Sequence, residues 1–212
     1  MKEFLELHGE SLVQSIIVHL GYVFISVAIG FVIALALGIA LSRVPRFSKV
    51  ILPIISIFQT VPGIVFIGVL FIYIGMIPFT VIIALTIYAI FPILKNTYVG
   101  ILEVPEKYKE AAKGCGMSPM QVLFKVELPL ALPTIIVGLR MSTIYIVSWA
   151  VLASMIGLGG LGDFIYIGVS TNNNELIIAG AIPAAIIAVG LGLLIDFIQK
   201  KVTPRGLRRN SR

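Results

Sequence analysis

Charged side chains and cysteine are both scarce in this chain. Only 12% of the 212 residues are Asp, Glu, Lys or Arg, and the one cysteine, Cys115, excludes an internal disulfide and a paired-cysteine metal site. The two histidines, His8 and His19, have no partner at ligand spacing, so we expect no bound metal. In contrast, 58% of the residues are hydrophobic, which is more apolar surface than one soluble core of this size can bury. We therefore expect a lipid bilayer to be the main solvent of the chain.

Motifs of catalytic sites are also missing. The sequence has no GxxxxGK[ST] loop, so the chain itself has no P-loop to bind ATP. It has no HExxH motif and no spaced pair of aspartates within an apolar run, which disfavours an intramembrane enzyme. We therefore predict that the chain is not an enzyme, has no catalytic residues and binds no cofactor.

Five apolar runs are long enough to cross the hydrocarbon core, which is roughly 30 Å thick and takes about 20 helical residues. They are Leu20–Leu41, Val50–Ile74, Ile77–Leu94, Pro133–Ile156 and Leu176–Ile198. No internal repeat, low-complexity tract or soluble linker divides the sequence. It therefore predicts an all-α fold, a polytopic membrane helical bundle that forms a single domain over residues 1–212.

Basic residues follow the first, third and fifth runs. The three groups are Arg43, Arg46 and Lys49; Lys95, Lys107, Lys109, Lys113 and Lys125; and Lys200, Lys201, Arg205, Arg208, Arg209 and Arg212. Because positively charged loops stay in the cytoplasm, we expect the N-terminus outside and the C-terminus inside, as an odd number of spans requires. The acidic and polar stretch Met1–Ser15 is then a short outward-lying segment rather than a cleavable signal peptide.

Polar and helix-breaking residues interrupt the second run at Gln59–Gly63. Pro62 removes a backbone donor, and such a break at membrane depth is tolerated only where it is buried in protein or lines a cavity. Further polar and aromatic groups occur in the third and fourth runs. The candidate residues of a translocation pathway are therefore Gln59, Thr60, Pro62, Tyr88, Ser142, Tyr145 and Trp149. Ser142, Tyr145 and Trp149 share one helical stripe, and aromatic faces attract quaternary ammonium ions, but ordinary packing uses the same residues.

One charge lies well inside each of the fourth and fifth runs. Arg140 is about two turns into the fourth run, and Asp196 is at a similar depth from the end of the fifth. An unpaired charge at such a depth costs a few kcal/mol, about 2.5–3.5 at the bilayer centre. We hypothesise that Arg140 and Asp196 form an inner polar pair; the alternative is that each side chain snorkels separately to the cytoplasmic surface.

The longest polar stretch, Asn96–Leu128, predicts two short cytoplasmic helices. Pro105 near the start and glycine at the end bound a helix within Glu103–Gly114. Ser118 followed by Pro119 is a favoured start for the second helix. The two helices are expected either to dock a cytosolic partner or to lie in the lipid interface as amphipathic segments.

The spacing of residues within this stretch resembles the EAA signature of ABC-importer permeases, EAA…G………I.LP. The matching residues are Glu110, Ala111, Ala112, Gly116, Leu128 and Pro129, and Val126 replaces the usual Ile. In that family the two short helices fit a groove on an ATP-hydrolysing subunit. The resemblance implies that the matching residues couple this chain to that ATPase, with Gly116 permitting the turn between the helices.

Partners and location also follow from the resemblance. It implies a cytosolic ABC ATPase dimer that binds the ATP and Mg, a second permease chain that is a copy or a paralogue, an extracytoplasmic substrate-binding protein, and the bacterial cytoplasmic (inner) membrane with its lipid. No nucleic-acid partner is expected, because the net charge of +6 is explained by the positive loops.

The resemblance extends over essentially the whole chain and is closest to permeases of glycine betaine, carnitine and choline importers. The stretches that carry it are Gln59–Pro62, Pro92–Tyr98, Arg140–Tyr145, Gly157–Asp163 and Lys201–Pro204. It implies import of quaternary-ammonium osmoprotectants, and hence a role in osmoregulation, by alternating access. The alternatives are a permease for another small solute, such as an amino acid or a related trimethylated compound, and a stand-alone channel or secondary carrier. The last alternative leaves the EAA spacing unexplained.

Overall fold

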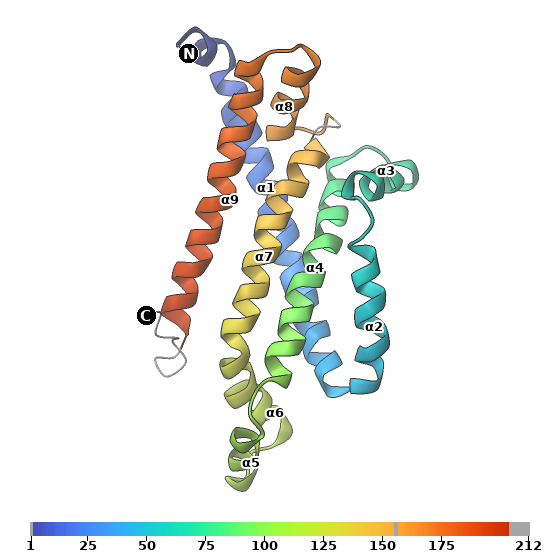
Figure 1. Ribbon diagram of the computed structural model, residues 1–212, viewed down its shortest axis with the longest axis vertical. Helices are drawn as coiled ribbons and strands as arrows, with labels where there is room; N and C mark the ends of the chain where they lie inside the picture. Colours follow the sequence, from blue (N-terminus) through green and yellow to red (C-terminus); the bar gives the residue numbers. More distant parts are fainter. Residues whose placement is uncertain (1, 155–156, 204–212) are drawn as a thin grey trace.

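Long apolar helices form the frame of the computed structural model, which describes residues 2–154 and 157–203 (Figure 1). Within these ranges, four helices carry the apolar stretches long enough to cross a membrane: α1 (Lys2–Arg43), α4 (Pro78–Leu102), α7 (Leu128–Ser154) and α9 (Asn174–Val202). The pair α2 (Pro45–Phe58) and α3 (Gly63–Ile74), whose axes are bent by 90° relative to each other, brings the number of spans to five if the two count as one interrupted span. The described ranges contain no strand. The predicted all-α bundle with about five membrane helices is therefore confirmed.

The N-terminal stretch is helical, and several predicted residues lie outside the described part of the chain. The stretch predicted to lie outward, Met1–Ser15, belongs from Lys2 onward to α1, which is one helix of 42 residues. Such a helix is about 63 Å long, roughly twice the hydrocarbon thickness, so part of it must extend beyond the membrane. The predicted end of the fourth run at Ile156, together with Met1 and the predicted cytoplasmic residues Arg205, Arg208, Arg209 and Arg212, lies outside the described residues.

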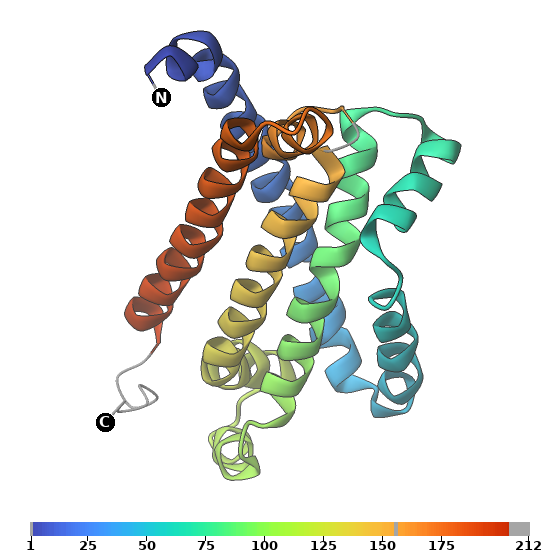
Figure 2. The ribbon, with the colours of Figure 1, turned by 45° about the horizontal axis from the view of Figure 1, so that its top comes forward.

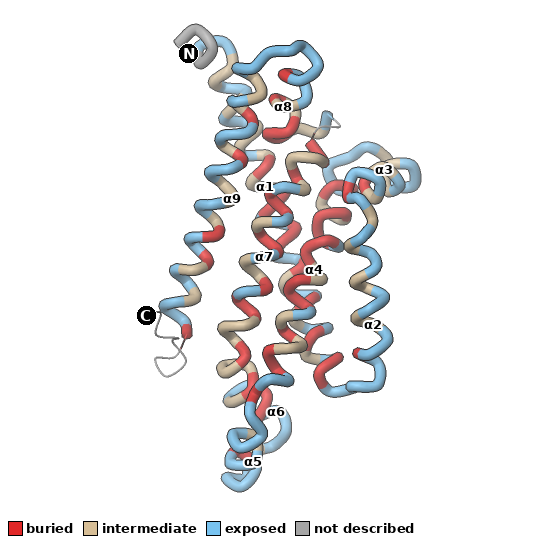
Figure 3. The backbone as a smooth tube through the Cα atoms, in the orientation of Figure 1, coloured by how far each residue is buried: buried red, intermediate tan, exposed pale blue. Residues whose placement is uncertain are grey.

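The core of the bundle lies between α1, α4 and α7, whereas α2 and α9 expose most of their surface (Figure 3). Small residues allow the close approach of these three helices. Gly30 of α1 faces Ala89 of α4, and Gly138 of α7 faces Asn96 of α4. Because lipid is as apolar as the side chains, close packing through small residues, rather than hydrophobicity, drives association of membrane helices. The outward apolar side chains of α9 are therefore available to lipid or to another protein.

The predicted break in the second run is confirmed between α2 and α3. Residues 59–62 lie between the end of α2 at Phe58 and the start of α3 at Gly63. The last of them, Pro62, has an extended backbone with φ −57° and ψ 128°. The Val61 carbonyl, which the break frees, accepts a hydrogen bond of 2.8 Å from the Tyr88 hydroxyl of α4. The break is thus supported by protein, as a non-helical segment at membrane depth requires.

Short helices close the two ends of the bundle (Figures 1 and 2). At one end lie α5 (Glu106–Gly114), α6 (Pro119–Val122) and a π-helical turn, η1 (Leu123–Glu127), which leads directly into α7. At the other end, near the N-terminus, α8 (Leu161–Ser170) packs against α9. The two short helices predicted within Asn96–Leu128 are present, but the second one is continuous with the membrane helix. The helix therefore begins at Pro119, well before the predicted Pro133.

The π-helical turn has a cause in the sequence. Pro129 has no N–H to donate to the Lys125 carbonyl, and its ring would collide with that carbonyl in a regular α-helix. In η1 the hydrogen bonds span five residues instead of four, and the Leu128 N–H donates to the Leu123 carbonyl. The helix can therefore pass through Pro129 without a chain break, and the short helix α6 is rigidly joined to α7.

Substitution of one interface glycine tests the packing of α4 on α7. A Cβ at position 138 would lie 2.6 Å from the Asn96 Cβ and 2.8 Å from the Pro92 carbonyl oxygen, whereas a Cβ at Gly190 meets open space. We expect Gly138→Ala to lower the free energy of unfolding in detergent by about 1–3 kcal/mol. Gly190→Ala is the matched control and is expected to raise it by up to about 1 kcal/mol. Equal unfolding midpoints of the two variants would contradict this packing.

Candidate functional site

Two capping motifs set the shape of the hairpin formed by α5 and α6. At the end of α5, Gly116 has φ +76°, its N–H donates to the Lys113 carbonyl, and the Met117 N–H donates to the Ala112 carbonyl. This pattern is a Schellman motif, which requires a left-handed residue and so favours glycine. At the start of α6, Ser118 and Gln121 form a reciprocal capping box, as the Ser-Pro start predicts. The turn between the two helices is therefore fixed by local sequence.

The six signature residues differ in exposure. Glu110 and Ala111 are exposed on α5, and Gly116 is exposed in the turn. Ala112 is buried against the rest of the hairpin, and Leu128 and Pro129 are half-buried where η1 joins α7. Met120 and Phe124, which are 64% and 58% exposed, add large apolar side chains on the second arm of the hairpin. This end of the bundle therefore presents small, acidic and apolar groups together on a surface that none of the described residues covers.

An ion pair attaches the hairpin to the first helix. Arg43, the last residue of α1, makes a bidentate contact with Glu127 of η1, with Nη1 3.2 Å from Oε1 and Nη2 against Oε2. The Glu127 side chain is only 4% exposed, and Arg43 supplies the partner that a buried carboxylate requires. The pair borders a polar pocket of about 350 Å³ that is also lined by Glu106, Lys109 and Lys113. The end of α1 and the start of α7 are thus connected through one carboxylate.

Helix α5 carries an additional set of charges along its length. The Lys109 ammonium lies 2.8 Å from the Glu106 carboxylate, and the Lys113 ammonium lies 3.8 Å from it. The hydrogen bond from Lys109, followed by the nearby positive charges, lowers the pKa of the Glu106 carboxyl. Because this carboxylate is exposed, water and salt screen the contacts, and they contribute little to stability.

An aromatic cluster supports the break between α2 and α3. Tyr88 stacks on Trp149 of α7 with ring centroids 5.0 Å apart, and Phe66 of α3 meets the edge of Tyr88 at 5.5 Å. Gly63, at the start of α3, faces the Trp149 ring, and a Cβ there would collide with it. The cluster therefore joins α3, α4 and α7 at the point where the second span is interrupted.

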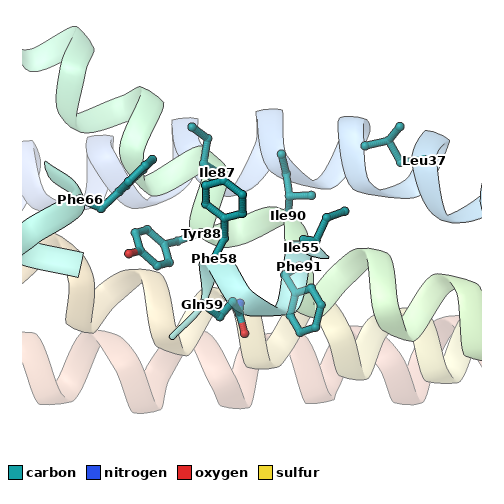
Figure 4. Close-up of a pocket in the computed structure, with 9 residues that line it drawn as sticks. All are labelled: Leu37, Ile55, Phe58, Gln59, Phe66, Ile87, Tyr88, Ile90 and Phe91. Atoms are coloured by element: carbon teal, nitrogen blue, oxygen red, sulfur yellow. The ribbon is translucent and has the colours of Figure 1, made fainter. Parts of the chain in front are cut away.

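Two pockets adjoin this cluster and share Gln59 and Tyr88. The larger, of about 340 Å³, is lined almost wholly by apolar side chains of α1, α2, α3 and α4, and Gln59 and Tyr88 provide its polar atoms (Figure 4). The smaller, of about 210 Å³, is lined by Gln59, Tyr88, Tyr145 and Trp149. The structure therefore brings together four of the seven residues predicted for a translocation pathway.

The other three predicted pathway residues lie elsewhere. Ser142 is fully buried and donates a 2.9 Å hydrogen bond to the Ala89 carbonyl, so it joins α7 to α4. Thr60 is exposed in the break and donates to the Ile57 carbonyl of the preceding turn. Pro62 is exposed at the start of α3. A role of all seven in transport stays a prediction.

Arg140 and Asp196 lie side by side between α7 and α9. Arg140 Nε is 3.0 Å from Asp196 Oδ1, although its N–H does not point at the oxygen closely enough for a hydrogen bond. Nearby, Gln199 of α9 donates to the Pro133 carbonyl of α7 at 3.2 Å. These polar contacts add to the packing of α9 against α7 and α8.

Sequence reasoning missed the partner of Glu127 and the role of Phe66. Glu127 lies between Val126 and Leu128, and an acid amid apolar residues in a signature could have been singled out as buried. Its partner Arg43 is 84 positions away and looks like any other cytoplasmic cation. Phe66 is one of 12 phenylalanines, and nothing in the local pattern separates it from lipid-facing ones.

A double-mutant cycle tests the contact between Arg140 and Asp196. In Arg140→Gln or Asp196→Asn the remaining charge loses its partner, and we expect each to lower the free energy of unfolding by about 1–3 kcal/mol. The double variant should be less destabilised than the sum of the two, as measured by thermal unfolding in detergent. Glu10→Gln, an exposed position, is the control and should change stability by under about 0.5 kcal/mol. If the losses of unfolding free energy in the two single variants add up to that of the double variant, the two side chains do not interact.

The sequence and fold of the chain match those of known proteins. Residues 26–207 match the family described as binding-protein-dependent transport system inner membrane component. Over 207 residues the chain is 39% identical to the choline transport system permease protein OpuBB of Bacillus subtilis (strain 168), covering 98% of this chain and 95% of that protein. It is also 39% identical over 208 residues to the glycine betaine/carnitine/choline transport system permease protein OpuCB of the same strain, with coverages of 98% and 96%.

A solved structure agrees with this match. An inward-facing structure of the MetNI methionine ABC transporter contains a chain that superposes with a TM-score of 0.85 at 25% identity, covering 94% of this chain and 99% of that one. The hairpin, the interrupted span and the helical frame thus occur in a chain that, over almost its full length, is similar to transport permeases. The chain belongs to the family of binding-protein-dependent transport system inner membrane components.

Proposed function

We propose that the chain is the transmembrane permease subunit of an ATP-driven ABC importer for quaternary-ammonium osmoprotectants of the glycine betaine, carnitine and choline type. The observation that carries this proposal is the 39% identity to two permeases named for these solutes, each covering 98% of the chain. The matched regions cover nearly the full length and so include both the interrupted span and the hairpin.

The hairpin supports the proposed coupling to an ATPase. Glu110, Ala111, Met120 and Phe124 are exposed together at one end of the bundle, and a surface with uncovered apolar side chains is typical of a docking site. The sequence has no P-loop, so ATP and Mg²⁺ are bound by the partner, a cytosolic ABC ATPase dimer. This chain then catalyses no reaction and transmits a movement.

The proposed orientation has the N-terminus outside and the C-terminus in the cytoplasm of a bacterial cell. The N-terminal end of α1 and the hairpin lie at opposite ends of the bundle, and α9 runs from the N-terminal end toward the hairpin end (Figure 1). The hairpin carries Lys107, Lys109 and Lys113, and the end of α9 carries Lys200 and Lys201. The hairpin and the end of α9 are therefore both basic, as the positive-inside rule expects of segments on the cytoplasmic side.

Transport in this proposal proceeds by alternating access. A binding protein delivers the solute on the outer side, and two permease chains, either copies or paralogues, form the pathway at their interface. Closure of the ATPase dimer moves α5 and α6, and η1 transmits the movement to α7. The exposed apolar side chains of α9 and α2 leave ample surface for the second chain and for lipid.

A permease for another small solute is the second candidate. The structural match to a methionine transporter favours an amino acid as that solute. A stand-alone channel or secondary carrier would have no use for an exposed hairpin that is rigidly joined to a membrane helix.

Measuring which solute stimulates ATP hydrolysis by the complex decides between these candidates. In liposomes that contain the permease, its ATPase and its binding protein, we expect choline, carnitine or glycine betaine to stimulate ATP hydrolysis and to accumulate inside. The kcat/KM of that ATPase activity should exceed the value with methionine by at least about tenfold. A stronger response to methionine would favour the amino-acid candidate. Uptake that continues without the ATPase would contradict both importer proposals.

A further inference from the structure

The smaller pocket at the interrupted span is lined by ring and amide groups alone. Gln59 comes from the break after α2, Tyr88 from α4, and Tyr145 and Trp149 from α7, around a volume of about 210 Å³. Among the residues that the structure describes, none with a charged side chain lines it. Pockets for drug-sized ligands measure about 300–1,000 Å³, so this one suits a smaller solute.

Two of the rings are held in fixed positions before any ligand arrives. Tyr88 is stacked on Trp149 with an interplanar angle of 19°, and its hydroxyl is held by the Val61 carbonyl. Phe66 meets Tyr88 edge-on, and Gly63 leaves no space for a side chain beside the Trp149 ring. A ligand that binds here therefore does not have to order these side chains, which lowers the entropic cost of binding.

The other two lining groups are free to meet a ligand. Tyr145 lies one helical turn before Trp149, and 47% of it is exposed. Across residues 6–154 and 157–203, no protein group hydrogen-bonds to the Tyr145 hydroxyl or to the side-chain amide of Gln59. The pocket therefore offers an accessible aromatic ring and an amide oxygen that has no partner within the chain.

This combination discriminates between classes of solute. An anion finds no cation here, and a divalent metal ion finds no carboxylate or imidazole ligand. A quaternary ammonium group is a large, weakly hydrated cation whose methyl surface packs against rings, and it is attracted by their negative faces. We propose that Gln59, Tyr88, Tyr145 and Trp149 form a weak transit site for the trimethylammonium group of the transported solute. This inference rests on the proposed function, because it names where on the permease that solute class is held.

The absence of a counter-charge in the pocket fits a transit site. A carboxylate would hold the cation more strongly, and a transport pathway needs sites that a solute can enter and also leave. Two of the four lining residues, Tyr145 and Trp149, are carried by α7, the helix that η1 joins to the hairpin. Movement of α7 would therefore shift Tyr145 and Trp149 relative to Gln59 and so change the affinity of the pocket for the trimethylammonium group.

The chain contains a built-in probe for this site, because Trp149 is its one tryptophan. In the full chain in lipid nanodiscs, without binding protein, choline should change the Trp149 emission saturably, with half-saturation in the millimolar range. The neutral isostere 3,3-dimethyl-1-butanol, which has the same shape without the charge, should bind about tenfold more weakly. Sodium chloride at the same ionic strength should have no saturable effect.

Substitutions of Tyr145 separate ring chemistry from shape. Tyr145→Leu should weaken choline binding by about tenfold, whereas Tyr145→Phe keeps the ring and should stay within about threefold of the parent. Tyr166→Leu on α8, which is 52% exposed and does not line the pocket, is the matched control. Thermal unfolding of each variant checks that the fold is retained.

Three results would overturn the transit site: an unsaturable response, equal affinity for choline and its neutral isostere, or unchanged affinity in Tyr145→Leu. Failure of the site is distinct from failure of the proposed function. If the reconstituted complex imports choline but Trp149 does not respond to it, the site is wrong and the function stands. If Trp149 responds as expected but no quaternary ammonium solute stimulates the complex, the function is wrong and the site stands.

Discussion

The contact between Arg43 and Glu127 fixes the hairpin to the bundle. Glu127 is the one charged side chain that is buried within the described residues, and a buried carboxylate without a partner would be strongly destabilising. Arg43 supplies that partner in a bidentate geometry from the end of α1. The same carboxylate lies in η1, the turn that Pro129 imposes on the start of α7. The first span, the hairpin and the central helix therefore meet at one ion pair.

Helix α7 connects the two regions that the proposed function needs. It begins at η1, beside the exposed hairpin, and carries Tyr145 roughly 26 Å further along its axis. There Trp149 packs on Tyr88 and against the break between α2 and α3. Because close-packed helices move as rigid bodies rather than deform continuously, the proposed displacement of the hairpin would reach the aromatic pocket through α7.

Much of the architecture follows from local sequence. Hydropathy predicts the spans, Gln59–Gly63 predicts the interrupted one, and Ser118 and Gly116 predict the hairpin, because capping and helix breaking depend on neighbouring residues. Which face of each membrane helix packs against the bundle is harder to predict from the sequence. In a membrane bundle the buried and lipid-facing sides are both apolar, so the pattern does not show that Ser142 faces α4 or that Phe66 joins the aromatic cluster. The pairing of Arg43 with Glu127 depends on contacts distant in sequence and has no local signal.

The number of solute molecules transported per ATP hydrolysed tests most directly whether transmission of the movement needs the hairpin to be fixed by this ion pair. In the reconstituted complex with Glu127→Gln, the account predicts that ATP hydrolysis persists while transport per ATP falls by about tenfold. Exchanging the charges, with Arg43→Glu and Glu127→Arg together, should recover part of the loss. An unchanged ratio in Glu127→Gln, with the complex assembled, would contradict the claim that this contact must fix the hairpin to α1 for the movement to reach the bundle.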